Sequence, residues 1–244
     1  MRLDPDRLSR ALARMAGGAV LPLSGLARLS GGANMESWSF GWGGAGYVLR
    51  RAPSPAFMEG RAFGHDIESA LVRAAHAAGV KAPEVVGDLV AEDGLGTGYV
   101  MRRVEAEVNP TKILASPPPT LLTDCARELA RIHSVALSGF DALPRSDAAS
   151  QLADLLTRFE SYGGDRPVFA LALRWLKDRV PAPDTPVLVH GDFRMGNLMV
   201  KDDGLAAVLD WELARVGDRH QDLAFGCINS WRFGQIDKPA FGCG

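Results

Sequence analysis

One apolar segment of the chain is interrupted in a way that few folds would tolerate. Residues 187–200 read VLVHGDFRMGNLMV, so polar residues separate two runs that would otherwise form buried strands. The interruption contains a carboxylate, Asp192, and an amide, Asn197, each beside a glycine. Burying such groups costs free energy unless they are hydrogen-bonded or hold a ligand. The segment therefore predicts a loop between two core strands whose polar groups have a chemical use.

The residues after this loop predict a β-hairpin that brings a second carboxylate close to it. Two apolar strands flank the sequence DDG at 202–204, which is a strong turn signal. A two-residue turn made of its last two residues places Asn197 opposite Asp210, whereas a three-residue loop shifts the register by one. With either turn, an amide oxygen and a carboxylate lie at the same end of the hairpin, near Asp192.

Oxygen ligands in this arrangement suit a hard cation. Mg²⁺ usually takes one or two carboxylates together with the phosphates of a substrate. Asn197 and Asp210 are therefore candidate magnesium ligands, and Asp192 is left to act on a hydroxyl group. Each of these residues alone is more simply explained as a cap of a strand or turn, but the three at this spacing favour the metal site.

The composition is that of an ordinary globular protein and argues against several other classes. The 244 residues are 47% hydrophobic and 23% charged, with a formal net charge of −2. Nothing in this balance points to nucleic acid or a membrane as partner, and there is no run of about 18 apolar residues to span a membrane. Three widely spaced cysteines without a CxxC pair favour a reducing compartment over a zinc site, so we expect the cytoplasm.

Turn and periodicity signals divide the chain into a β-rich part and an α-rich part. After an amphipathic N-terminal helix, residues 24–103 predict a small, mostly antiparallel sheet interrupted by one helix. From residue 104 the periodicity is mainly helical, apart from the hairpin. We therefore expect an α+β fold with an N-terminal lobe at 1–103 and a C-terminal lobe at 104–244.

Three helices are expected in the second part. The first has an apolar face made of Leu122, Ala126, Leu129 and Ile132, the second covers ALALRWLKDRV, and the third covers DLAFGCINSWRFG. The final residues, KPAFGCG, contain no closing helix or strand. A frayed terminus and the lack of later elements explain this ending equally well.

The polar loop and the hairpin together resemble the catalytic machinery of kinases. His190 and Asp192 followed by Asn197, and then Asp210 after an apolar strand, match H-x-D-x-x-x-x-N and the aspartate of D-F-G. The sequences HGDFRMGN, LDWE and GDRHQDLA are more similar to the aminoglycoside phosphotransferase and choline kinase-like family. This resemblance, from about residue 24 to the end, implies a two-lobed protein-kinase-like fold with a small antiparallel N-lobe and a mainly helical C-lobe that would be incomplete at its C-terminus.

The resemblance also assigns residues to a nucleotide site. The loop LSGGANMES would cover the phosphates, and strand YVLRR would supply a cation, Arg50 or Arg51, with Arg50 in the place of the family's usual lysine. Glu68 at the start of the following helix would pair with that cation. The nucleotide contacts implied in this way are made by Gly31, Gly32, Asn34, Arg50, Met101 beside the adenine, and the backbone of Arg102 and Val104.

These residues imply a small-molecule kinase that transfers the γ-phosphate of ATP or GTP to a hydroxyl group. Asp192 would accept the proton of the acceptor, with Mg²⁺ held by Asn197 and Asp210. One alternative is a catalytically impaired kinase-like module that binds nucleotide, which the arginine at position 50 and the abrupt ending favour. Another is a metal-dependent phosphohydrolase using His190, Asp192 and Asp210, which leaves Asn197 and the glycine loop unexplained. The acceptor is not predicted.

Overall fold

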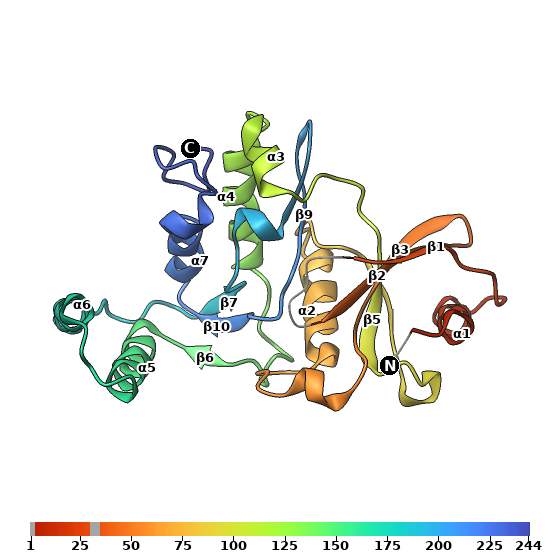
Figure 1. Ribbon diagram of the computed structural model, residues 1–244, viewed down its shortest axis with the longest axis horizontal. Helices are drawn as coiled ribbons and strands as arrows, with labels where there is room; N and C mark the ends of the chain where they lie inside the picture. Colours follow the sequence, from red (N-terminus) through yellow and green to blue (C-terminus); the bar gives the residue numbers. More distant parts are fainter. Residues whose placement is uncertain (1–2, 30–34) are drawn as a thin grey trace.

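The first lobe is built around one antiparallel sheet. The computed structural model describes residues 3–29 and 35–244, and Figure 1 shows two lobes side by side. Within the described residues, the sheet of the first lobe has the order β1-β2-β3-β5-β4. Its strands are β1 (Ser24–Arg28), β2 (Glu36–Trp42), β3 (Ala45–Ala52), β4 (Val85–Asp88) and β5 (Thr97–Arg102).

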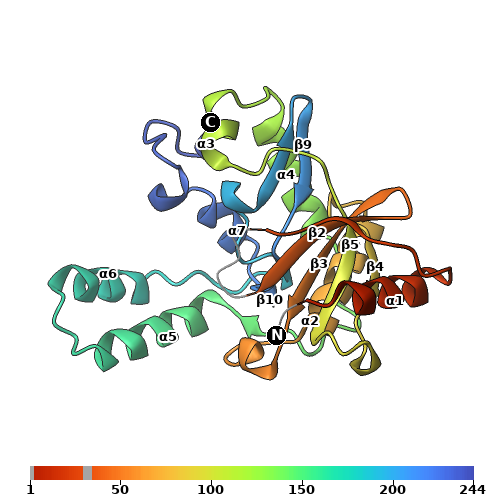
Figure 2. The same ribbon diagram turned by 45° about the vertical axis from the view of Figure 1, so that its right-hand side comes forward.

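The alternation of side chains gives this sheet two different faces. The pairs Phe40–Tyr47 and Leu49–Val100 lie on one face and are buried against α1 (Pro5–Ala16). Successive residues of a strand point to opposite faces, so Val48 and its partner Met101 lie on the other face, toward α2 (His65–Ala77) and the second lobe. Figure 2 shows α1 and α2 on opposite sides of the sheet.

The N-terminal helix forms because its ends are capped and its apolar face is covered. Asp4 accepts hydrogen bonds from the N–H groups of Asp6 and Arg7, and Gly17 ends the helix with a φ of 64°. Leu8 and Leu12 are fully buried in the core beneath the sheet. The amphipathic helix expected at the N-terminus is therefore confirmed, and it completes the core of the first lobe.

The second lobe combines helices with short strands. Its strands are β6 (Arg145–Ser146), β7 (Val187–Val189), β8 (Leu198–Lys201), β9 (Gly204–Val208) and β10 (Arg215–Gly217). Its helices are α3 (Pro110–Ala115), α4 (Leu121–Ile132), α5 (Ala148–Ser161), α6 (Pro167–Lys177) and α7 (His220–Phe225). The strands form a small sheet of order β6-β10-β7 and the separate hairpin β8-β9. These strands hold the polar loop 190–197 between them.

The helices of this lobe differ in part from those expected. Helix α4 buries Leu121, Cys125, Leu129 and Ile132, whereas Leu122 is exposed, so the predicted apolar face was rotated. Helix α5 was not predicted, and the third expected helix is shorter, because α7 ends at Phe225 and a 3-10 turn follows at Asn229–Trp231. Helices α5 and α6 extend away from the rest of the lobe in both views (Figures 1 and 2). No helix in the described ranges is long and apolar enough to cross a membrane.

The register of the hairpin differs from the expected one. The pairing begins with Lys201 opposite Gly204, so the two turn residues are Asp202 and Asp203, and a bulge follows before Leu198 pairs with Val208. The prediction that Asn197 lies opposite Asp210 was therefore wrong by one residue. The Asn197 carbonyl instead accepts from the N–H of Leu209 at 2.8 Å. The amide and the carboxylate nevertheless stay at the same end of the hairpin.

The burial of α1 against the sheet gives a prediction about stability. Leu12 is 1% exposed, so Leu12→Ala leaves a cavity between α1 and the sheet and should lower the free energy of unfolding by about 2–4 kcal/mol. Urea denaturation followed by circular dichroism measures this change. Leu155→Ala, at an exposed leucine of α5, is the matched control and should cost less than about 1 kcal/mol. A loss as small in Leu12→Ala as that expected for the control would contradict a contribution of α1 to the core.

Candidate active site

A cavity of about 540 Å³ lies between the two lobes and gathers most of the predicted site residues. Arg50, Met101, Arg102 and Val104 line it from the first lobe and the connecting segment, and Asn197 and Asp210 line it from the hairpin. The remaining walls are largely apolar and include Val48, Val72, Tyr99, Met199, Leu209 and Trp211. Gly31, Gly32 and Asn34 lie outside the described residues. An apolar cavity with a few convergent polar groups is typical of a small-molecule site.

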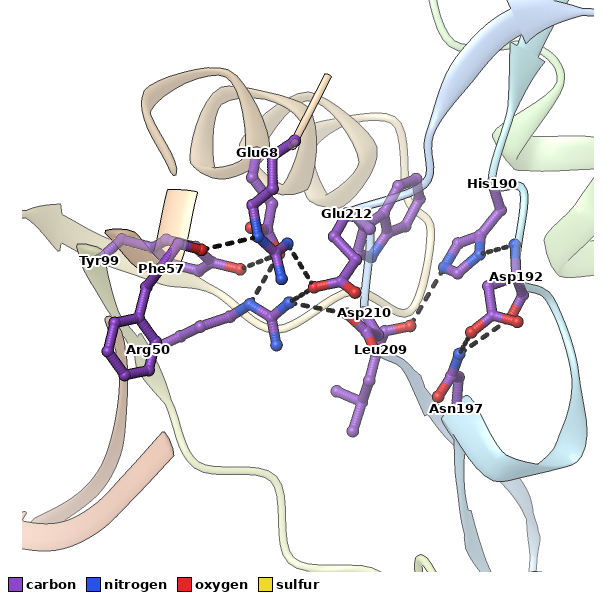
Figure 3. A network of polar contacts seen from close by, with 12 residues as sticks. Arg50, Phe57, Glu68, Tyr99, His190, Asp192, Asn197, Leu209, Asp210 and Glu212 are labelled. Carbon is purple, nitrogen blue, oxygen red and sulfur yellow. Dashed lines mark hydrogen bonds and ion pairs between the residues drawn. The ribbon is translucent and has the colours of Figure 1, made fainter. Parts of the chain in front are cut away.

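Three carboxylates surround the guanidinium group of Arg50 (Figure 3). Its Nε lies 2.9 Å from Oε1 of Glu68 on α2. Its Nη2 lies 2.8 Å from Oδ1 of Asp210 and 2.5 Å from Oε2 of Glu212. The hydroxyl of Tyr99 donates to the same Glu68 oxygen at 3.1 Å. The expected pair of Arg50 with Glu68 is thus part of a larger buried network that also reaches the second lobe.

Burial and charge act against each other in this network. Burial alone would lower the pKa of Arg50, but the carboxylates of Glu68 and Asp210 raise that pKa above its ordinary value. Burial raises the pKa of Glu68 and the pKa of Asp210, and Arg50 opposes both shifts. The guanidinium therefore stays charged, and its charge opposes the effect of burial on the neighbouring carboxylates.

The alternation along β3 decides which of the two adjacent arginines faces the cavity. Arg50 lies on the same face as Val48 and lines the cavity. Arg51 points to the opposite face, is fully buried, and lies 2.7 Å from Glu36. Because side chains alternate along a strand, these two roles are not interchangeable. Arg50 is therefore the residue in position to reach a ligand.

Asp192 is held from both sides by neighbouring side chains. Its Oδ1 accepts from Nε of Arg194 at 2.8 Å, and its Oδ2 accepts from Nδ2 of Asn197 at 2.5 Å. The same Asn197 nitrogen also donates to the Asp192 carbonyl at 3.0 Å. The guanidinium of Arg194 in turn lies over the ring of Trp231, 4.3 Å from its centroid. The carboxylate is thus fixed in orientation, and the amide oxygen of Asn197 is left for another partner.

His190 is buried and supports the loop through hydrogen bonds. Its Nδ1 accepts from the N–H of Asp192 at 3.2 Å, and its Nε2 lies 3.1 Å from the carbonyl of Leu209. Burial lowers the pKa of His190, which keeps the ring neutral. A neutral ring that accepts at Nδ1 carries its proton at Nε2 and donates it to Leu209. His190 therefore joins the polar loop to the residue before Asp210.

Asp222 on α7 completes the support of this loop. Its carboxylate is fully buried and accepts from the N–H groups of His190 and Gly191, both at 2.9 Å. His133, the C-cap of α4, lies 3.0 Å from the same carboxylate and so also has a structural contact. Gly191 has a φ of 81°, and a Cβ there would lie 2.3 Å from the carbonyl oxygen of Leu213. The turn at Gly191 therefore requires glycine.

The two predicted magnesium ligands fit a hard cation that also has phosphate ligands. Asp210 has a φ of 66°, a left-handed backbone that asparagine and aspartate tolerate best among the larger residues, and it lines the cavity together with Asn197. Within residues 3–29 and 35–244, no group of three or more His, Cys, Asp or Glu side chains could hold a metal ion. Two oxygen ligands from the protein match the way Mg²⁺ is held with a nucleotide, which supplies further oxygens.

Some backbone groups near the predicted adenine site are already hydrogen-bonded within the first lobe and are therefore not free to bind an adenine edge. The N–H of Arg102 donates to the carbonyl of Glu84 at 2.8 Å, and the N–H of Arg103 donates to Gly46 at 3.0 Å. The carbonyl of Arg102 and the N–H of Val104 are the backbone groups of these two residues that suit a purine edge. Met101 lines the cavity on the face that it shares with Val48.

Several residues of the site were not predicted from the sequence. Glu212 accepts from Arg50 and, at 2.7 Å, from Nη1 of Arg61, which comes from the segment before α2. A second concavity of about 750 Å³, next to Arg61 and Glu212, contains none of the predicted site residues. Arg194 and Tyr99 were also missed as partners of Asp192 and Glu68. The acidic residue two positions after Asp210 was a visible signal of a second carboxylate near the site.

The family predicted from HGDFRMGN and LDWE is confirmed by comparison with known proteins. The model of the phosphotransferase enzyme family, APH, matches residues 25–241. The chain is 29% identical over 198 residues to acyl-CoA dehydrogenase family member 10 of Mus musculus, which covers 74% of this chain and 18% of that protein. It is 28% identical over 240 residues to acyl-CoA dehydrogenase family member 11 of Gallus gallus, which covers 92% of this chain and 31% of that protein. The chain thus spans less than a third of the length of these relatives.

Solved structures confirm the expected α+β, two-lobed protein-kinase-like fold. A candidate aminoglycoside phosphotransferase from Ralstonia eutropha superimposes with a TM-score of 0.75 at 23% identity, covering 100% of this chain and 77% of that chain. The streptomycin–ATP–APH(2")-IIa ternary complex gives a TM-score of 0.64 at 19% identity, covering 91% and 76%. Macrolide 2'-phosphotransferase MphH from Brachybacterium faecium gives 0.64 at 20% identity, covering 91% and 76%.

The buried carboxylate of Asp222 gives a prediction about the polar loop. In Asp222→Asn, one of the two loop N–H groups faces an amide NH₂ instead of an oxygen, so the free energy of unfolding should fall by about 1–3 kcal/mol. Asp147→Asn, at the N-cap of α5, is the matched control and should be nearly neutral, because both residues cap helices well. Urea denaturation distinguishes the two variants. A neutral effect of Asp222→Asn would mean that the loop does not depend on this contact.

His65 at the start of α2 gives a prediction about pH. Burial, with Arg50 and Arg61 nearby, lowers the pKa of His65 from 6.5 to about 4, so its stabilising contribution is complete above pH 6.5 and is lost as the pH falls to 4. The loss amounts to roughly 3 kcal/mol over this range. In His65→Gln the fall in unfolding free energy between pH 6.5 and 4 should be smaller by about this amount. His220→Gln, at an exposed histidine, is the control and should retain the wild-type fall.

Proposed function

Because the chain belongs to the phosphotransferase enzyme family, we propose that it transfers the γ-phosphate of ATP or GTP to a hydroxyl group of a small molecule, with Mg²⁺ as cofactor. The observation that carries this proposal is the convergence of Arg50, Asn197 and Asp210 on one cavity, with Asp192 bonded to Asn197. A cation for phosphate, two oxygen ligands and a fixed carboxylate are the parts that phosphoryl transfer requires.

The side chains of the site have different roles in the proposed reaction. Asp192 orients the acceptor hydroxyl and accepts its proton, and it is held for this purpose by Arg194 and Asn197. Asn197, through its amide oxygen, and Asp210 would hold Mg²⁺. When bound, Mg²⁺ supplies positive charge that neutralises the phosphate oxygens. Arg50 contributes a second, fixed positive charge, positioned by Glu68.

The cavity walls support a purine nucleotide as the donor. Met101 and Met199 line the cavity where an adenine or guanine ring would lie, and the carbonyl of Arg102 and the N–H of Val104 would bind its edge. The neighbouring structure APH(2")-IIa is described with streptomycin and ATP, and APH(4)-Ia with AMP-PNP and hygromycin B. These neighbours support ATP as the donor, and GTP is the alternative that a binding comparison would test.

The acceptor is proposed only as a class, and the known proteins define the compounds to test. Solved neighbours are phosphotransferases named for aminoglycosides and macrolides. The sequence relatives are instead named as acyl-CoA dehydrogenase family members. A hydroxylated acyl-CoA thioester therefore belongs in the acceptor panel beside the antibiotics. This chain spans less than a third of the length of these relatives. The proposal therefore concerns the activity of this chain and not that of the complete relatives.

The two alternative functions have less support. A kinase-like module without catalysis would bind nucleotide in the same cavity, but it would not need Asp192 to be held by both Arg194 and Asn197. A phosphohydrolase using His190 is disfavoured, because that ring is fully buried and bonded to Leu209 and to the loop itself. The lobe boundary near residue 104 and the cytoplasmic location stay predictions.

Substitution of the proposed base tests this function directly. Asp192→Asn should lower the turnover of ATP with a responsive acceptor by about 10²–10⁴-fold, because the amide accepts no proton, while Mg²⁺-dependent ATP binding persists. Acceptor-dependent ADP release and calorimetric binding of ATP measure the two properties. Asp203→Asn, in the exposed hairpin turn, is the matched control and should leave turnover unchanged.

Each failure of this experiment points to a different function. Nucleotide binding without turnover of any acceptor would support the binding module instead. Release of phosphate from simple esters in the absence of nucleotide would support the hydrolase.

A further inference from the structure

One nitrogen of Arg50 serves two carboxylates at the same time. Its Nη2 lies 2.8 Å from Asp210 and 2.5 Å from Glu212. The Glu212 oxygen in this contact also accepts from Arg61 at 2.7 Å. Figure 3 shows Glu212 directed toward the Arg50 guanidinium, with Asp210 beside it. Glu212 therefore contacts two guanidinium groups, those of Arg50 and Arg61. Asp210, in contrast, shares Arg50 with Glu212.

Asp210 would have to serve two cations in the proposed reaction. As a magnesium ligand it must turn a carboxylate oxygen toward the cation, but one of its oxygens is paired with Arg50. If Asp210 turned away and no other acid replaced it, Nη2 of this buried guanidinium would lose its acidic partner, which is unfavourable. The release of Asp210 from Arg50 is therefore easy only if another carboxylate keeps Nη2 satisfied.

Glu212 satisfies that requirement without moving. Its oxygen is already in contact with Nη2, and its side chain is 20% exposed against 31% for Asp210. Arg61, 15% exposed, holds the same oxygen from the other side and balances its charge. The fork of a guanidinium is what makes the arrangement possible, because Nε remains on Glu68 while Nη2 reaches the hairpin. A lysine ammonium is a single point charge and would not bridge these acids in the same way.

We propose that Glu212 is a positioning residue that holds Arg50 in place of Asp210 and so leaves Asp210 available to Mg²⁺. This inference rests on the proposed function, because it assumes that Asp210 binds the cation. It also gives the arginine at position 50 a specific partner. Glu212, two residues after the proposed metal ligand Asp210, pairs with a guanidinium that reaches farther than a lysine ammonium would.

The proposal is tested by a cycle of substitutions at positions 50 and 212. The variants are Glu212→Gln, Arg50→Lys and the double variant, and the probe is ADP binding measured by calorimetry across a series of Mg²⁺ concentrations. In Glu212→Gln, Arg50 has Asp210 as its remaining hairpin acid, so the Mg²⁺ concentration for half-maximal binding should rise about tenfold. In the Arg50→Lys background the same substitution should change it less than about twofold.

Two controls separate a positioning role from a general loss of structure. Glu212→Asp keeps the charge at a shorter reach and should give an increase of about threefold, between the wild type and Glu212→Gln. Asp165→Asn removes an acid from an exposed ion pair with Arg166 and should leave the Mg²⁺ requirement unchanged.

The possible outcomes distinguish this inference from the proposed function. An equal rise in the Mg²⁺ requirement in both backgrounds would show that Glu212 acts independently of Arg50 and would overturn the proposal. No rise in Glu212→Gln would also overturn it, while leaving the kinase function intact. Absence of Mg²⁺-dependent ADP binding in the wild type would contradict the proposed function and this inference together. Should Glu212→Gln fail to fold, an unchanged requirement in Glu212→Asp would overturn the proposal.

Discussion

The buried guanidinium of Arg50 ties together three elements that are distant in the sequence. It belongs to β3, and its acidic partners come from α2 and from the segment just after β9. Charges in so dry an environment are stable only while they remain paired, so each element constrains the others. This side chain therefore links α2 and the segment that contains Asp210 and Glu212 to the sheet. The cavity between the lobes lies beside it, because the opposite face of the sheet is filled by α1.

A second buried charge fixes the polar loop in the same way. Asp222 on α7 holds the N–H groups of His190 and Gly191, and the ring of His190 holds the carbonyl of Leu209. A displacement of α7 would therefore also shift Asp210. The path runs from Asp222 to the N–H of His190, and from the ring of His190 to Leu209, the residue before Asp210. The two charge networks meet at Asp210, where the first supplies a cation and the second fixes the backbone. This explains how a short loop with little regular structure can hold reactive groups at defined positions.

Much of the site was predictable because it depends on local sequence. The loop HGDFRMGN and the hairpin were recognisable from their apolar flanks, and the alternation along YVLRR explains why Arg50 and not Arg51 faces the cavity. The register of the hairpin was not predictable, since a bulge and the choice of turn residues shift the pairing by one residue. Helix α5 was missed although Leu152, Leu155, Leu156 and Phe159 have helical spacing; of these four side chains the structure buries Leu152. Glu212 and Arg61 were missed because their contact joins residues 151 positions apart.

A buried tryptophan fixes the direction of the two acidic side chains next to it in the sequence. Trp211 lies between Asp210 and Glu212 in the sequence, is 1% exposed, and packs on the ring of His190 with centroids 4.8 Å apart. Its Nε1 donates to the carbonyl of Val208 at 3.4 Å, so its polar atom is also satisfied. With Trp211 buried in the core of the second lobe, its two acidic neighbours are directed away from that core and toward Arg50. The sequence D-W-E therefore orients two carboxylates by anchoring the residue between them.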